Sequence, residues 1–117
     1  MTDRRVVITG LGCITPLAES VEVLFEGLCQ GRSGISLIES FDTAQFPVKF
    51  GGECKGFDIE KYAGVREGKR MDRFTQMAMA SAIQAVNDSG LNFENENKRR
   101  VSVIVGTGIG GIKEIED

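Results

Sequence analysis

The sequence predicts an α/β fold. Two short runs of mostly β-branched residues, Val6–Thr9 and Val101–Val105, have the apolar character of parallel strands that are covered on both faces. Between them, two longer segments repeat apolar residues with the period of an α-helix. The order is therefore strand, helix, irregular segment, helix and strand. The 117 residues are enough for at most one ordinary domain with a buried core.

The first strand and the first helix have clear boundary signals. The run Val6–Thr9 ends at Gly10, where a turn is expected. Ser20 is a favourable N-cap residue and predicts a helix over residues 21–29, which Gly31 ends as a C-terminal glycine. We expect one face of this helix to be packed, and the apolar residues on that face are Val21, Leu24, Phe25, Leu28 and Cys29.

The segment from Arg32 to Gly64 has mixed signals, because glycines divide it into short pieces. We expect a short strand over residues 47–50 and a helical turn over residues 58–63. A polar loop over residues 92–100 precedes the second strand, and residues 112–117 begin a segment that is expected to be helical.

The second helix has the stronger pattern. It is predicted to start between Lys69 and Asp72 and to run to Ser89, with Gly90 as its stop signal. Its apolar face contains several small residues, which predicts a close-packed and mostly buried helix. The residues of this face are Phe74, Met77, Ala78, Ser81, Ala82, Ala85 and Val86.

Composition excludes several classes of function. The net charge of −3 argues against non-specific binding of nucleic acid, and no apolar run approaches the roughly 20 residues that span a bilayer. The N-terminus reads as a strand and lacks the features of a signal peptide. Three widely spaced cysteines suit a reducing cytosol. The absence of histidine excludes Ser-His-Asp, Cys-His and histidine-based metal sites from these residues, and we expect no metal or cofactor.

A glycine-rich run follows the second predicted strand. Gly106, Gly108 and Gly111 satisfy the pattern G-x-G-x-x-G of dinucleotide-binding turns. That pattern usually follows the first strand of its domain and has an acidic partner about 20 residues later, a position that this chain does not contain. A tight strand exit, at which another backbone or a ligand approaches closely, is the favoured interpretation, and nucleotide binding stays open as the weaker one.

A basic cluster precedes the second helix. Arg66, Lys69, Arg70 and Arg73 would lie at a helix N-terminus, where the macrodipole disfavours positive charge. This cost points to a function for the cluster, a docking patch for an acidic partner. From the residues alone, however, a solvated helix face is the favoured interpretation, because charged runs usually face solvent. We assign no function to the basic residues 98–100, and we expect Cys13 and Cys29 to have packing roles only.

Six motifs occur together in a characteristic order and cover essentially the whole chain. Together they resemble the N-terminal part of the β-ketoacyl-[acyl-carrier-protein] synthases, most closely the type II elongating enzymes. The motifs are RRVVITGLGCITP (Arg4–Pro16), GxSGISxI (Gly31–Ile38), FDT (Phe41–Thr43), KFGGE (Lys49–Glu53), KRMDRF (Lys69–Phe74) and VGTGIGG (Val105–Gly111).

This resemblance implies a thiolase-like fold, with a mixed sheet covered by helices, of which residues 1–117 form part of the first half. It also implies a longer, homodimeric, cytoplasmic acyltransferase of fatty-acid elongation. Such an enzyme joins an acyl chain to malonyl acyl carrier protein by decarboxylative condensation. The family's cysteine nucleophile and two histidines would lie beyond Asp117, so we expect no catalytic residue in this segment and no activity from it alone.

The resemblance also assigns roles to individual residues. Arg66, Lys69 and Arg70 match the positions that dock acyl carrier protein. Ile109, with Gly108 beside it, matches the position that lines the acyl pocket near the dimer interface. Gly68 departs from relatives that have a polar residue there and is expected to loosen the docking segment. A polyketide ketosynthase and a non-catalytic chain-length paralogue remain alternatives, and a dinucleotide-binding module is a remote one.

Overall fold

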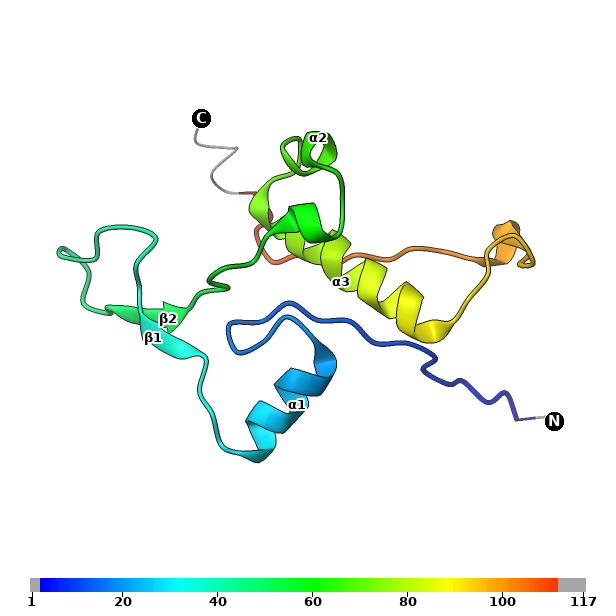
Figure 1. The fold of residues 1–117 in the computed structure, drawn as a ribbon, viewed down its shortest axis with the longest axis horizontal. Coiled ribbons are helices and arrows are strands. Elements are labelled where there is room, and N and C mark those ends of the chain that lie inside the picture. Colours follow the sequence, from blue (N-terminus) through cyan, green and yellow to red (C-terminus); the bar gives the residue numbers. More distant parts are fainter. Residues whose placement is uncertain (1–2, 112–117) are drawn as a thin grey trace.

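The computed structural model describes residues 3–111, so the predicted helical segment at residues 112–117 lies outside the described residues. The long helix α3 runs through the middle of the molecule, with α1 and a small β-hairpin in separate positions around it (Figure 1). The elements in chain order are α1 (Val21–Cys29), β1 (Ile35–Leu37), β2 (Phe50–Gly52), the 3-10 turn η1 (Ile59–Lys61), α2 (Val65–Gly68), α3 (Arg73–Ser89) and the 3-10 turn η2 (Lys98–Arg100).

The helix boundaries confirm the capping signals of the sequence. Helix α1 has the predicted bounds, and the Ser20 hydroxyl accepts a hydrogen bond from the Val23 amide at 3.4 Å. Gly31 follows the helix with a φ of 69°, a left-handed conformation that favours glycine. Gly90 ends α3 in the same way with a φ of 64°. These ends depend on local side-chain and backbone chemistry, which explains why the sequence predicts them.

The predicted burial of the two helices is partly wrong. On α1, Phe25 and Leu28 are 68% and 59% exposed and Cys29 is exposed, so its expected packing role is not met. On α3, the fully buried residue is Ala80, which lies off the predicted apolar face. Periodicity indicates which face of a helix is apolar, but the neighbouring segments decide which residues are covered. Among residues 3–111 the buried hydrophobic residues are Phe57, Ile59 and Ala80.

The irregular region contains a β-hairpin. Strands β1 and β2 are antiparallel, with Ile35 opposite Gly52 and Leu37 opposite Phe50. The strand predicted over residues 47–50 is therefore displaced toward Gly52, because pairing with β1 sets its position. The carboxylate of Glu53 extends this contact by accepting hydrogen bonds from the amides of Glu39 and Ser40 at 2.9 and 3.0 Å. Hydrogen bonds from Ser40 and Glu39 lower the pKa of Glu53. The turn predicted at residues 58–63 is confirmed as η1.

The two predicted buried strands are extended but unpaired in this structure. Val6 is 92% exposed and Ile104 is 91% exposed, and residues 3–111 provide no strand ladder to either segment. The prediction of burial and pairing at Val6–Thr9 and Val101–Val105 is wrong for the described part of the chain. A β-branched pattern favours extended backbone, whereas a ladder requires a neighbouring strand at about 4.8 Å.

Two glycines allow the N-terminal segment to lie directly on α3. A Cβ atom at Gly10 would collide with the carbonyl oxygen of Ala85, and one at Gly12 would collide with that of Ser81. The same segment is hydrogen-bonded to the helix: the Leu11 amide donates to Asp88 at 2.9 Å, and the Cys13 amide donates to Gln84 at 3.0 Å. The small residues of α3 thus form the close contact that the sequence predicted, with a glycine-containing segment as their partner.

We expect the substitution Gly12→Ala to destabilise the protein. The new methyl group would meet backbone atoms of α3, including the Ala85 nitrogen at 2.8 Å, so the segment must move away from the helix. Overpacking of this kind costs about 1–3 kcal/mol of unfolding free energy, measurable as a lower midpoint in thermal or urea unfolding. Gly106→Ala is the matched control, because a Cβ there meets nothing within 4 Å. Equal stability of the two variants would contradict the proposed contact.

Candidate functional site

An exposed basic segment lies at the N-terminal end of α3. This segment, residues 65–72, consists of α2 and the connector that leads into α3. Arg66, Lys69 and Arg70 are all exposed, and none of them forms an ion pair with an acidic residue among residues 3–111. The three side chains that the resemblance assigns to docking are therefore exposed on one short segment.

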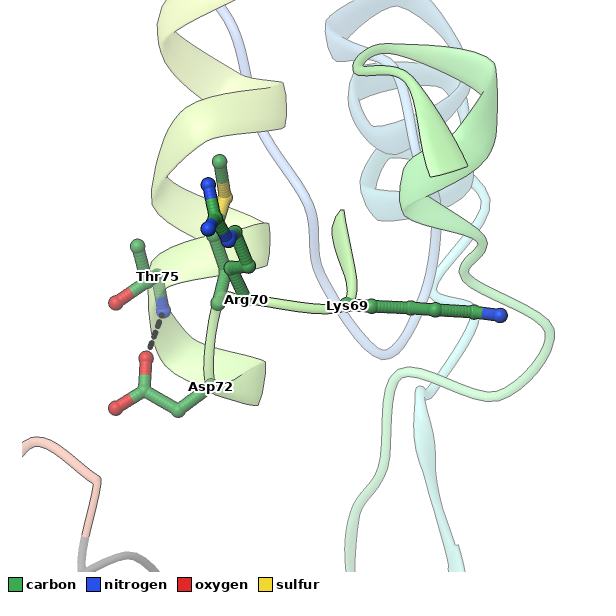
Figure 2. A pocket seen from close by; sticks show the side chains of 5 residues that line it. Lys69, Arg70, Asp72 and Thr75 are labelled. Atoms are coloured by element: carbon green, nitrogen blue, oxygen red, sulfur yellow. Dashed lines mark hydrogen bonds between the residues drawn. The ribbon is translucent and has the colours of Figure 1, made fainter. Parts of the chain in front are cut away.

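The connector forms one wall of an open cavity of about 340 Å³, lined by Lys69, Arg70, Met71, Asp72 and Thr75. Figure 2 shows the Lys69 side chain directed away from Asp72 and Thr75. The Asp72 carboxylate accepts a hydrogen bond from the Thr75 amide at 3.3 Å and caps α3, so this acidic group is used within the helix. The positive groups of the connector remain available at the surface.

The structure does not place the whole basic cluster at the N-terminus of one helix, as the sequence predicted. Helix α2 ends at Gly68. Helix α3 begins at Arg73, because Asp72 before it has the extended backbone of an N-cap, with a ψ of 164°. Only Arg73 lies in the first turn of α3. The argument from an opposed helix dipole therefore applies to Arg73 and gives no support to docking by the other three residues.

Gly68 has a role different from the expected loosening. It is buried, and a Cβ atom at this position would lie 2.7 Å from Cγ2 of Ile59, closer than real contacts allow. Ile59 belongs to the small core and is 7% exposed. The missing side chain thus lets the basic segment lie directly on the core, which corrects the expectation of a loose segment.

Two side chains of α3 hold this region in place: Arg73, which the sequence predicted only as a member of the basic cluster, and Gln76, for which it predicted no role. Arg73 donates to the carbonyl oxygens of Phe57 at 3.0 Å and Cys54 at 3.1 Å, and its guanidinium lies 4.6 Å from the centre of the Phe57 ring. Gln76 donates from Nε2 to the carbonyl oxygens of Gly68 at 2.9 Å and Met71 at 3.0 Å. These partners are 5 to 19 residues away, so no local sequence signal identifies them.

The glycine-rich loop ends beside the same helix terminus. A Cβ atom at Gly110 would lie 3.7 Å from the ring of Phe74, and one at Gly111 would collide with the Asp72 carboxylate. Gly110 has a φ of 78°, a left-handed backbone conformation that favours glycine. Gly110 is not one of the three glycines of the G-x-G-x-x-G pattern. The loop and the basic segment therefore meet at the first turn of α3.

The predicted packing role of two loop glycines is not met. Nothing lies within 4 Å of a Cβ built on Gly106 or Gly108, in the part of the loop that the structure describes. Ile109 is 73% exposed and lines none of the four described cavities. Its assignment to an acyl pocket, with Gly108, stays a prediction.

The other candidate residues have structural surroundings. Cys13 is half-buried, and burial, with a smaller effect of Glu22, raises the pKa of its thiol, which does not favour a nucleophile. Residues 98–100 form η2 beyond the C-terminal end of α3 (Figure 1).

Across residues 3–111, no three His, Cys, Asp or Glu side chains are placed to hold a metal ion. No helix in that range has the length and apolar character needed to cross a membrane.

Comparisons with known proteins find relatives along the whole chain. Residues 3–117 match the family described as β-ketoacyl synthase, N-terminal domain. The chain is 46% identical over 116 residues to 3-oxoacyl-[acyl-carrier-protein] synthase 2 of Vibrio cholerae, covering 99% of this chain. It is 44% identical over 117 residues, its entire length, to the protein of the same name from Synechocystis. The chain spans 28% of the length of each of these curated relatives.

A solved structure confirms the fold class. The structure of the ishigamide ketosynthase/chain length factor matches 97% of this chain and 28% of its own, with a TM-score of 0.83 and 34% sequence identity. The likeness to a ketosynthase shows the α/β, thiolase-like class predicted from the sequence.

Proposed function

Because the chain belongs to the β-ketoacyl synthase family, whose N-terminal domain it matches, we propose that it forms the N-terminal part of a 3-oxoacyl-[acyl-carrier-protein] synthase of fatty-acid elongation. The observation that most supports this activity is the 46% identity, along almost the whole chain, to a relative of that name. The complete enzyme would be a cytoplasmic homodimer. Residues 1–117 would supply carrier docking and one wall of the acyl pocket.

The proposed reaction places the nucleophile outside these residues. An acyl chain is held as a thioester on a cysteine, and malonyl acyl carrier protein loses carbon dioxide to give an enolate. The enolate carbon attacks the acyl carbonyl, and the cysteine thiolate leaves as the new carbon–carbon bond forms. The 117 residues contain no histidine to stabilise the enolate, and Cys13 has the raised pKa of a packed thiol.

Carrier docking is proposed at the basic segment. Arg66 is exposed on α2, and Lys69 and Arg70 are exposed on the connector that follows it. Their positive charge suits the acidic surface of an acyl carrier protein. The glycine-rich loop lies beside the first turn of α3, next to this segment. A carrier bound there would deliver its acyl group toward Ile109.

A chain-length subunit is the second candidate function. The matched solved structure is named as a ketosynthase together with a chain length factor, which supports this alternative. Such a subunit would share the docking and pocket regions and lack the nucleophile.

The complete protein is expected to convert an acyl carrier protein thioester and malonyl acyl carrier protein into the 3-oxoacyl product with release of carbon dioxide, and residues 1–117 alone are expected to be inactive. Product analysis by mass spectrometry checks both statements. Turnover by residues 1–117 would overturn the placement of the nucleophile. Activity that appears only when a partner subunit is added would favour the chain-length subunit.

The double substitution Lys69→Glu/Arg70→Glu in the complete protein is expected to weaken carrier-protein binding by about tenfold at low salt, because two attractive charges become repulsive. The difference should shrink as salt screens the charges. Binding titrations at two salt concentrations measure it. Arg99→Glu/Arg100→Glu is the matched control, with the same charge change on η2, beyond the opposite end of α3 (Figure 1). Equal affinity of the two double variants would contradict docking at the basic segment.

Substitution of Ile109 by tryptophan is expected to shorten the longest acyl chain that the enzyme accepts, because the larger side chain fills part of the proposed pocket. The length distribution of the products measures this effect. Leu37→Trp is the control, since it enlarges an exposed apolar residue on β1, away from the loop. An unchanged distribution in the Ile109 variant would remove Ile109 from the pocket.

A further inference from the structure

Gln76 links the basic segment to the body of α3. Its Nε2 donates both hydrogens to backbone carbonyls of that segment, those of Gly68 and Met71, at 2.9 and 3.0 Å. These two carbonyls flank Lys69 and Arg70, so the Gln76 carboxamide spans the backbone that presents both cations. Its position one helical turn inside α3 makes it part of a rigid element.

The orientation of the carboxamide is fixed by a second donor. Arg73 Nη1 lies 3.4 Å from Gln76 Oε1, and Arg73 is itself bound to the Phe57 and Cys54 carbonyls. Because a guanidinium can only donate, the oxygen of Gln76 must face Arg73 and the nitrogen must face the connector. The half-buried Gln76 thus has a partner for each polar atom.

The basic segment also lies against the core. The buried Gly68 lies close to Ile59, so the end of α2 cannot move toward the core, and Gln76 holds its carbonyl. The Gly68 carbonyl also accepts the Met71 amide at 3.2 Å, which closes the connector into a tight turn. The backbone of this segment is therefore ordered although the side chains of Lys69 and Arg70 have no ion pair with residues 3–111.

We propose that Gln76 is a positioning residue for carrier docking. It holds the backbone from Gly68 to Met71, so that Lys69 and Arg70 keep fixed positions from which both can bind an acidic partner. This inference rests on the proposed docking function. It assigns Gln76 no contact with the carrier protein and no part in the chemistry. A pre-ordered connector reduces the entropy lost when the two side chains are immobilised in the complex.

The test is Gln76→Met in the complete protein. Methionine has a similar length and cannot donate to either carbonyl, so the connector loses both side-chain hydrogen bonds. We expect the KM for the carrier-bound substrate to rise about fivefold, because a connector without these hydrogen bonds must be ordered each time a carrier protein binds. The kcat and the rate with a carrier-free pantetheine thioester are expected to be unchanged. The salt dependence of KM should become weaker, because the two cations no longer act together.

Gln84→Met is the matched control. Gln84 is another half-buried glutamine of α3 whose Nε2 donates to two oxygens, the Glu19 carbonyl at 2.7 Å and the Tyr62 hydroxyl at 2.9 Å. It contacts no part of the basic segment in these hydrogen bonds. We expect Gln84→Met to lower the thermal midpoint and to leave the KM for the carrier-bound substrate unchanged.

Two further variants separate the possible failures. If the methionine variant does not fold, Gln76→Asn replaces it. Asparagine keeps the carboxamide but is one methylene too short to reach the Gly68 and Met71 carbonyls, so the same rise in KM is expected. An unchanged KM in a folded Gln76 variant, while Lys69→Glu/Arg70→Glu raises it, would overturn the positioning role alone. An unchanged KM in all of these variants would overturn docking at this segment, and the inference would fail with it. Equal rises in KM for Gln76→Met and Gln84→Met would show a general loss of structure and would also overturn it.

Discussion

The described part of the chain depends on hydrogen bonds from polar side chains of α3 to the backbone of other segments. Arg73 and Gln76 bind carbonyl groups of residues 54–71, and Gln84 and Asp88 bind amides of residues 11–13. Loop backbone that packs against a helix must find partners for its polar groups, since an unpaired buried group costs free energy. The buried apolar core is small, with Phe57, Ile59 and Ala80. Helix α3 therefore organises its neighbours mainly through directional contacts, and apolar burial plays the lesser part.

Close approach to α3 and to the core explains the positions of several glycines. Gly10 and Gly12 let the N-terminal segment contact the backbone of α3, and Gly68 lets α2 contact Ile59. At Gly10 and Gly12 a methyl group would meet backbone atoms of α3 and displace the segment with its hydrogen bonds, whereas at Gly68 it would meet the Ile59 side chain. Gly110 differs, because its left-handed backbone turns the loop past Phe74. Glycine thus meets two different requirements: small size where segments approach closely, and a left-handed backbone where the loop turns.

The first turn of α3 brings together two features that are about 40 residues apart in the sequence. Asp72 caps the helix and lies beside Gly111, and the connector that holds Lys69 and Arg70 precedes it directly. A helix terminus is a rigid and well-defined place, so it can hold a docking surface and the glycine-rich loop in a fixed relation. We therefore propose that docking and acyl binding share this one structural support.

The sequence by itself determined the family, the α/β class, the bounds of α1, the C-terminal end of α3 and the exposed basic residues. Each of these depends on local chemistry, such as the Ser20 cap or the left-handed Gly90, or on an ordered set of motifs. Tertiary structure decided the rest: the break between α2 and α3, the burial of Ala80, the unpaired course of Val6–Thr9 and the roles of Gln76 and Gln84. A helix face or a strand pattern does not specify its partner, and these features depend on contacts between segments up to 77 residues apart. The physical reason is that periodicity and capping act within a few residues, whereas hydrogen bonds and close packing across the fold join positions that only the folded chain brings together.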